Sequence, residues 1–197
     1  MKPVQSGGDP RSTYAGGDRE LYSSLFAQSQ AEITPLYFNA PLAPPLAAER
    51  EGQRVELEKA WQAFEVLRQK YDWVLVEALG GLGSPITHET TVVDLAWDWR
   101  LPTVLVVPVK LGAIGQAVAN VALARMSRVH LKGIVLNCVQ PCSAEDIANW
   151  APANLIQSLT SIPILGLIPH LTDPTDLEKL AQVASNLELE RLIPLTW

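Results

Sequence analysis

A carboxylate followed by a glycine-rich turn is the part of this chain whose residue types best suit chemistry. The apolar run 73–76, typical of a strand buried on both faces, precedes Glu77, and the glycine-rich segment 80–85 follows it. Open α/β sheets bind ligands beyond the carboxyl ends of their strands. Glycine lets the backbone approach a phosphate, and carboxylate oxygens suit Mg²⁺. The stretch predicts either a nucleotide or metal site, or a plain connection in which Glu77 caps the next turn.

Two charged residues near the amino end can serve the same chemistry. Lys2 stands beside a turn over 6–8, and an ammonium with turn amides can hold a phosphate or carboxylate. The alternative is a solvated lysine next to a chain end. Asp18 can share one Mg²⁺ with Glu77, because this ion usually takes one or two carboxylates plus phosphate oxygens. Its alternative is a helix cap for a helix over 19–27.

One residue in the second half of the chain is a further candidate. Asn137, at a predicted strand end, has an amide that can recognise a base edge, although such an asparagine can also simply form a turn. Cys138 and Cys142 are too few for a disulfide framework or a four-thiolate zinc site. They are expected to be small buried residues, and the histidines show no metal-binding spacing.

Composition and charge narrow the class of protein. The 197 residues suit one domain, and 48% hydrophobic with 18% charged residues indicates a globular chain. A net charge of -6 argues against nucleic acid as the main partner. No apolar run reaches the roughly 20 residues that span a bilayer, and 1–8 lacks the apolar core of a secretory signal. We therefore expect a cytoplasmic protein without a membrane partner.

Apolar runs alternate with helical patterns along the chain. Strands are predicted at 73–76, 103–107, 133–137 and 163–168, and helices at 19–27, 45–51, 55–71, 90–99, 116–127, 144–161 (bent near Pro152) and 176–192. The segments 9–17 and 33–45 are predicted as loops. This alternation is typical of a mostly parallel sheet with helices on both faces, whose strand exits share one binding edge.

The strand exits together resemble the dethiobiotin synthetase family over nearly the whole chain. The motifs that carry the resemblance, each weak alone but in the family's order, are Lys2–Gly7, Gly17–Asp18, Val76–Gly81, Val109–Gly112, the strand ending at Asn137, and Leu165–Pro169. The resemblance implies a P-loop NTPase-like α/β fold and a cytosolic homodimer. It also implies an ATP-dependent cyclo-ligase of biotin synthesis, which closes the ureido ring of dethiobiotin from 7,8-diaminononanoate (7,8-diaminopelargonate), CO₂ and ATP.

The resemblance also implies roles for individual residues. Lys2 matches the catalytic lysine, which stabilises carbamate and phosphoryl charge, and Ser6 matches a substrate-binding position. Asp18 and Glu77 match the carboxylates that hold Mg²⁺ and ATP. The positions that match the ATP site are Asp18, Glu77, Ala78, Leu79, Gly80, Asn137, Cys138, Pro169, His170, Leu171 and Asp176.

Two departures from the family pattern matter. Ala78 stands where the family usually has glycine, and no G-x-x-x-x-G-K-[ST] string occurs in the 197 residues. We expect one domain over 1–197 that lacks its first β-loop-α unit, of roughly 30 residues. On this expectation the sequence is a truncated or mis-started version of a longer protein, and the chain as written is inactive. The alternatives are a ligand-binding homologue without catalysis and another amide synthase or ATPase of the P-loop class.

Overall fold

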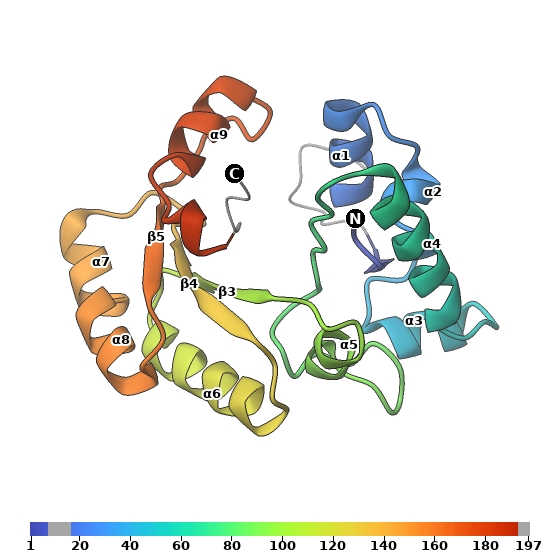
Figure 1. The fold of residues 1–197 in the computed structure, drawn as a ribbon, viewed down its shortest axis with the longest axis horizontal. Coiled ribbons are helices and arrows are strands. Elements are labelled where there is room, and N and C mark those ends of the chain that lie inside the picture. The colour runs from blue at the N-terminus through green and yellow to red at the C-terminus, as the bar shows by residue number, and fades with distance from the viewer. Residues whose placement is uncertain (8–16, 193–197) are drawn as a thin grey trace. The chain divides into compact units, whose positions relative to one another are not determined.

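The computed structural model describes residues 1–7 and 17–192, which form two compact units, 1–92 and 93–197. Helices alternate with strands, and within the described residues the strands form two parallel sheets, one in each unit (Figure 1). This confirms the α/β class with parallel strands. The loop predicted over 9–17 lies outside the described residues except for Gly17.

The first unit packs helices against a two-stranded sheet, β1–β2. Its elements are β1 (Val4–Ser6), α1 (Asp18–Phe26), α2 (Gln30–Ile33), β2 (Leu36–Phe38), α3 (Pro44–Arg50) and α4 (Leu57–Lys70). Val4 pairs with Leu36 in parallel, so the chain between them must cross over, and α1 and α2 lie in that crossover. The side chains of Val4 and Phe38 are almost fully buried.

The strand β2 was not expected, because the proline-rich segment 33–45 was predicted to be a loop. Leu36 and Phe38 are buried while Tyr37 between them is only half-buried, which is the alternation of a strand with one covered face. The run is three residues long. A strand this short, flanked by prolines, carries too little periodicity to be recognised from sequence.

The prediction of a buried strand over 73–76 is wrong. The segment has no strand structure, and the exposed fractions of Trp73 and Leu75 are 59% and 86%. Its neighbour is Met1, whose nitrogen donates to the Leu75 carbonyl at 2.7 Å and whose carbonyl accepts from the Glu77 N–H at 2.9 Å. These two bonds align segment 73–76 with the start of the chain beside β1. A single paired residue cannot form a strand ladder, and it does not cover the apolar side chains.

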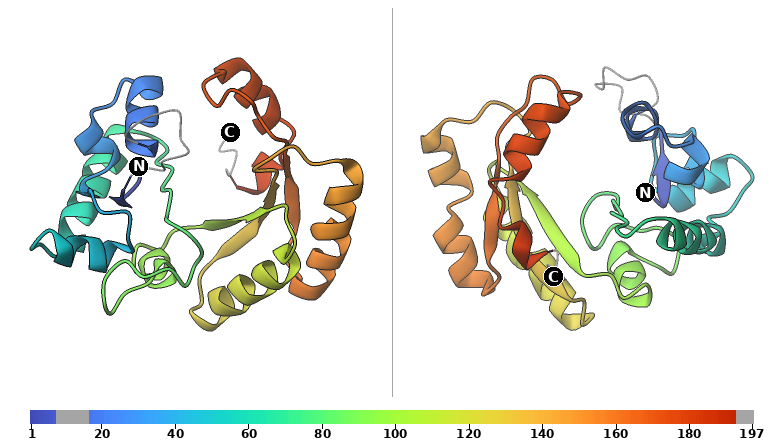
Figure 2. Two further views of the ribbon diagram at one scale, coloured as in Figure 1. Left: turned by 180° about the vertical axis from the view of Figure 1, so that it is seen from behind. Right: turned by 45° about the horizontal axis from the view of Figure 1, so that its top comes forward.

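The second unit contains a three-stranded parallel sheet in the order β3–β4–β5. Its elements are α5 (Val92–Asp98, which begins at the last residue of the first unit), β3 (Thr103–Pro108), α6 (Ala113–Met126), β4 (Leu131–Asn137), α7 (Ala144–Trp150), α8 (Ala153–Thr160), β5 (Ile164–Ile168), α9 (Leu177–Ala184) and the 3₁₀ helix η1 (Leu189–Arg191). The helices α6 to α8 lie on one face of the sheet, and α9 with η1 lies on the other (Figures 1 and 2).

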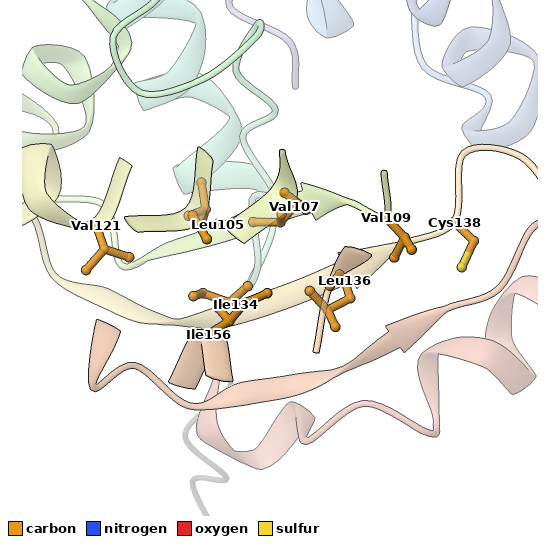
Figure 3. Close-up of a cluster of buried hydrophobic side chains, with 11 residues drawn as sticks. Leu105, Val107, Val109, Val121, Ile134, Leu136, Cys138 and Ile156 are labelled. Carbon is orange, nitrogen blue, oxygen red and sulfur yellow. The ribbon is translucent and has the colours of Figure 1, made fainter. Parts of the chain in front are cut away.

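The core of the second unit lies between the sheet and α6 to α8. This core includes Leu105 and Val107 of β3 and Ile134 and Leu136 of β4 (Figure 3). Val106, between Leu105 and Val107, is 52% exposed. Within its own unit β3 is therefore covered on one face only, which corrects the expectation that every strand is buried on both faces.

The helix predictions for this unit hold, with two refinements. The bend expected near Pro152 is a break, because α7 ends at Trp150 and Pro152 caps α8. The last predicted helix, 176–192, is divided into α9 and η1 by a turn in which the Glu188 N–H donates to the Leu165 carbonyl. Among the described residues, no helix combines the length and apolar character that crossing a bilayer requires.

Candidate functional site

The side chain of Lys2 joins the two carboxylates that were predicted to act with it. Its ammonium forms an ion pair with Asp18 Oδ2, and it lies 3.2 Å from Glu77 Oε1. Lys2 is only 8% exposed, which excludes the alternative of a solvated terminal lysine. Residues distant in sequence thus form one charged cluster in the first unit, which we call the Lys2 cluster (Lys2, Asp18, Glu77 and Tyr22).

Asp18 enters the Lys2 cluster from the first turn of α1. Gly17 is the N-cap of this helix and Asp18 its first residue, so the alternative that Asp18 itself caps the helix is wrong. One free N–H of the first turn, that of Arg19, instead donates to Gln5 Oε1 at 3.1 Å. Gln5 lies on β1 and is buried, so this bond fixes the start of α1 against the strand. Because Asp18 has no capping bond, its carboxylate remains available to Lys2.

Tyr22 holds the second oxygen of Glu77, and sequence reasoning missed it. Its hydroxyl donates to Glu77 Oε2 at 2.5 Å while Oε1 accepts from Lys2. The alternative that Glu77 caps the turn after it is therefore not what the structure shows. Tyr22 follows Asp18 by four residues on α1, which places both on one face of the helix. That spacing was the available signal for Tyr22.

The charges of the Lys2 cluster fix its protonation. Burial works to lower the pKa of Lys2, but the charges of Glu77 and Asp18 and their hydrogen bonds outweigh it and raise this pKa above its ordinary value. Burial, followed by the negative charge of Glu77, raises the pKa of Tyr22. Lys2 therefore stays an ammonium and Tyr22 a neutral donor at neutral pH. Because the Asp18 and Glu77 side chains are 43% and 42% exposed, both carboxylates can still be reached from solvent.

The glycine turn after Glu77 is closed by its own residues. The Gly81 N–H donates to Ser84 Oγ at 3.0 Å, and the Ser84 N–H donates to the Gly81 carbonyl at 2.9 Å. Gly80 has a φ of +58°, and a Cβ there would collide with the Ser84 hydroxyl. Ala78 is exposed and Leu79 half-buried. The role of residues 77–80 toward a nucleotide stays a prediction.

Ser6 ends β1 next to a tightly packed glycine. Its hydroxyl donates to the Leu42 carbonyl at 2.5 Å, and its oxygen can still accept a hydrogen bond. Gly7 follows with a φ of +65°, and a Cβ there would lie 2.7 Å from Pro41 Cα. Glycine at this position is what allows β1 to turn past Pro41. The substrate-binding role of Ser6 stays a prediction.

The residues predicted to bind adenine lie in the second unit, at neighbouring strand ends. Asn137 ends β4 and is paired with Ile168, the last residue of β5, which Pro169, His170 and Leu171 follow directly. Because the two strands are parallel and their last residues are paired, these exits share one edge of the sheet. Their role in binding adenine is a prediction.

Two of these predicted ATP-site residues have other roles in the fold. Cys138 is 5% exposed and packs in the core, as expected of a small buried residue, and its N–H donates to the Ile168 carbonyl. Burial, with a smaller contribution from the Cys142 thiol, raises the pKa of the Cys138 thiol to about 11. Asp176 is the N-cap of α9, and its Oδ1 accepts from the Lys179 N–H at 3.0 Å. Its carboxylate therefore already serves the helix start.

The carboxylates of the Lys2 cluster fit a hard cation. In the part of the chain that the structure describes, no group of three or more His, Cys, Asp or Glu side chains can hold a metal ion. Asp18 and Glu77 offer carboxylate oxygens on two sides of one ammonium. Mg²⁺ is commonly bound through one or two carboxylates, with waters and substrate phosphates completing its coordination. The donor set therefore suits Mg²⁺ bound together with a nucleotide.

Curated relatives of high identity show the family of this chain. A family model described as an AAA domain matches residues 1–177. The chain is 60% identical to the ATP-dependent dethiobiotin synthetase BioD of Gloeothece citriformis (strain PCC 7424), over 91% of this chain and 80% of that protein. It is 45% identical to the protein of the same name from Gloeobacter violaceus (strain ATCC 29082 / PCC 7421), over 96% of this chain and 80% of that one. Among solved structures, a ParA family ATPase from Chlorobium tepidum TLS is matched with a TM-score of 0.47 and 14% identity, over 100% of this chain and 81% of that chain.

Proposed function

This chain belongs to the dethiobiotin synthetase family, and we propose that it is the greater part of an enzyme that closes the ureido ring of dethiobiotin. The substrates are 7,8-diaminononanoate, CO₂ and ATP, and the other products are ADP and phosphate. The observation that supports this proposal best is the buried Lys2 ammonium held between the carboxylates of Asp18 and Glu77. Ligation of this kind transfers a phosphoryl group, and such reactions depend on positioned charge more than on covalent chemistry by the protein.

Lys2 would stabilise negative charge at the reacting centre. An ammonium has three N–H donors, and among the described residues two oxygens, Asp18 Oδ2 and Glu77 Oε1, accept from it. The third donor can reach an oxygen of the carbamate or of the phosphoryl group. Because burial and two carboxylates fix the ammonium, little reorganisation is needed as charge develops.

Asp18 and Glu77 would hold Mg²⁺ together with the triphosphate, and the ion would neutralise phosphate charge when bound. Ser6, whose hydroxyl oxygen can still accept a hydrogen bond, would contact the diamine. The exits of β4 and β5, 137–138 and 169–171, would bind the adenine ring. The proposal also includes a homodimer in the cytoplasm, as the family resemblance implies.

We further propose that residues 1–197 belong to one ligase domain whose phosphate-binding loop is encoded before Met1. No G-x-x-x-x-G-K-[ST] string occurs in the 197 residues, and the chain spans about 80% of two of its relatives. Among the described residues, the backbone of the apolar segment 73–76 bonds to Met1, and Leu75 is exposed. The in-frame sequence upstream of Met1 tests this point, and an upstream reading frame without such a loop would contradict it.

The test of the function is product formation. The protein, both as the 197-residue chain and extended by its upstream in-frame sequence, would be given the diamine, bicarbonate and ATP. Mass spectrometry of dethiobiotin and a coupled assay of ADP would follow the reaction. We expect the extended protein to form both products in equal amounts, and only when the diamine is present. ADP release at the same rate with and without the diamine would instead indicate an ATPase of another P-loop group.

A second candidate function, ligand binding without turnover, is favoured by the missing phosphate-loop string. This function predicts that the extended protein binds the diamine or ATP but forms no dethiobiotin. Calorimetric titration with each ligand, on the preparation used for the product assay, separates the two functions.

A further inference from the structure

The Lys2 cluster contains one member, Tyr22, to which the function proposed above gives no role. Its hydroxyl donates to Glu77 Oε2 at 2.5 Å, and its ring lies 6.2 Å from that of Phe26, measured between centroids. The role of this half-buried phenol, beside a carboxylate that faces solvent, therefore has to be explained.

Glu77 needs an external constraint because its backbone provides little. It lies outside any helix or strand, and its N–H donates to the Met1 carbonyl at 2.9 Å. Glutamate has three side-chain torsions, so a half-exposed Glu77 would sample several rotamers without further contacts. Lys2 and Tyr22 each donate to one oxygen of the Glu77 carboxylate. Together the two bonds fix the orientation of that carboxylate.

The same helix positions the other carboxylate. Asp18 and Tyr22 lie four residues apart on α1, so they share one helix face. The start of α1 is fixed to β1 through the bond from the Arg19 N–H to Gln5 Oε1. The helix therefore carries Asp18 itself and also, through Tyr22, the donor that orients Glu77.

We propose that Tyr22 is a positioning residue, which holds the Glu77 carboxylate in the orientation needed to bind Mg²⁺ and ATP jointly with Asp18. The inference rests on the proposed function, in which these two carboxylates take the ion. Tyr22 touches neither ion nor substrate, and it acts through Glu77. Partners that orient a metal-binding carboxylate in this way typically contribute about 10- to 100-fold to metal affinity or activity.

The experiment compares Tyr22→Phe with Tyr71→Phe in the full protein, including any chain encoded upstream of Met1. Tyr22→Phe keeps the ring that packs near Phe26 and removes only the donor. Tyr71→Phe removes a phenol from the end of α4, at a residue that is 38% exposed. Binding is measured without turnover, by titrating Mn²⁺ into protein and ATP and following free Mn²⁺ by electron paramagnetic resonance. Turnover is then measured against Mg²⁺ concentration.

We expect Tyr22→Phe to weaken Mn²⁺ binding and raise the Mg²⁺ concentration for half-maximal rate by about 10-fold or more. Its rate at saturating Mg²⁺ should fall less, and its circular dichroism spectrum should match that of the wild type. Tyr71→Phe should behave as the wild type in all three measurements. A merely structural role would lower the melting temperature and leave metal binding by the folded fraction unchanged.

The outcomes separate this inference from the proposed function. A wild type that forms dethiobiotin and a Tyr22→Phe variant with unchanged metal dependence would overturn the positioning role alone. A wild type that forms no dethiobiotin but binds Mn²⁺ more tightly than Tyr22→Phe would overturn the function and leave the positioning role standing. Absence of Mn²⁺ binding by the wild type with ATP would overturn the positioning role.

Discussion

Lys2 Nζ lies 3.2 Å from Glu77 Oε1, although 75 positions separate the two residues in the chain. This contact joins the start of the β1 region to the residue before the glycine turn, and Asp18 on α1 completes it from the other side. An ammonium that is about nine-tenths buried is stable here because two carboxylates offset the cost of removing its charge from water. The side chains of those carboxylates are more than a third exposed. The positive charge of Lys2 is therefore buried, while the carboxylates that accept from it can be reached from solvent.

The first prediction concerns the charge of Lys2. In the full protein, Lys2→Met keeps the apolar stem and removes the ammonium, which leaves Asp18 and Glu77 without their shared partner. We expect kcat for dethiobiotin formation to fall by about 10²- to 10³-fold, the typical effect of losing one preorganised donor. The matched control is Lys59→Met, which removes an exposed ammonium paired with Glu56 on the same unit. Equal kcat values for Lys2→Met and the wild type would contradict a catalytic role for this lysine.

The second prediction concerns the stability of the Lys2 cluster at high pH. The native pKa of Lys2 is raised above 10.5, so below that pH both native and unfolded chains hold the proton and the full stabilisation is present. As the pH rises past 10.5, the unfolded chain loses this proton first, and stability is lost as the pH passes through the native pKa. Tyr22 contributes in the same direction above its ordinary value of 10.0.

Urea unfolding at pH values from about 8 to 11 would check this second prediction. The free energy of unfolding of the wild type should exceed that of Lys2→Met at neutral pH, and the difference should narrow as the pH rises past 10.5. A difference that stays constant over the whole range would show that the Lys2 ammonium is not stabilised by its neighbours.

The third prediction concerns the turn after β1. Gly7 and Gly52 have nearly equal φ values, +65° and +67°, but a Cβ at Gly7 would lie 2.7 Å from Pro41 Cα, whereas Gly52 has open space around it. Gly52→Ala should cost about 1 kcal/mol, the strain of a left-handed alanine. Gly7→Ala adds the collision and should cost about 1–3 kcal/mol more, because a backbone contact cannot move aside easily. Urea unfolding of both variants measures the two costs, and equal losses would mean that Pro41 does not restrict this turn.

The parts of the fold that sequence predicted are those whose signal lies within one element. The helix expected over 55–71 is α4, because apolar residues recur at helical spacing over its whole length. The strand expected over 133–137 is the carboxyl part of β4, where the burial of 133–136 produced a continuous apolar run. In both elements the buried residues are those that the local hydrophobic pattern indicates, so the pattern was sufficient to predict the element.

The failures occurred where a remote partner decides the structure. The run 73–76 has the composition of a buried strand, yet within the part of the chain that the structure describes it forms no strand and bonds to Met1. No local signal reports how many neighbouring strands a segment will find. Within the Lys2 cluster, the charged residues were predicted because an ammonium or a carboxylate next to a glycine-containing turn suggests a site for phosphate or a metal ion. Tyr22 was missed because a phenol on an amphipathic helix has many possible uses. Its contact with Glu77 depends on where α1 lies in the first unit, which is a tertiary property.

The last prediction concerns the close approach of β4 and β5. A Cβ at Gly133 would overlap the side chain of Leu165, which is 1% exposed and belongs to the buried core. Gly133→Ala should therefore destabilise the protein by about 1–3 kcal/mol, as expected for an overpacked core. The matched control is Gly115→Ala in α6, where a Cβ meets nothing within 4 Å. That substitution should stabilise the protein by about 0.5–1 kcal/mol, because alanine favours the helix.

A double-mutant cycle shows whether Leu165 is the cause of the loss at Gly133. Leu165→Ala alone should cost about 2–5 kcal/mol through the cavity that it leaves. In the double variant the new methyl group enters that cavity, so the combined loss should be smaller than the sum of the single losses by about 1 kcal/mol or more. Chemical unfolding of the four proteins measures this interaction energy. Strict additivity would indicate that Gly133 is required by the backbone of β4, and not by the side chain packed over it.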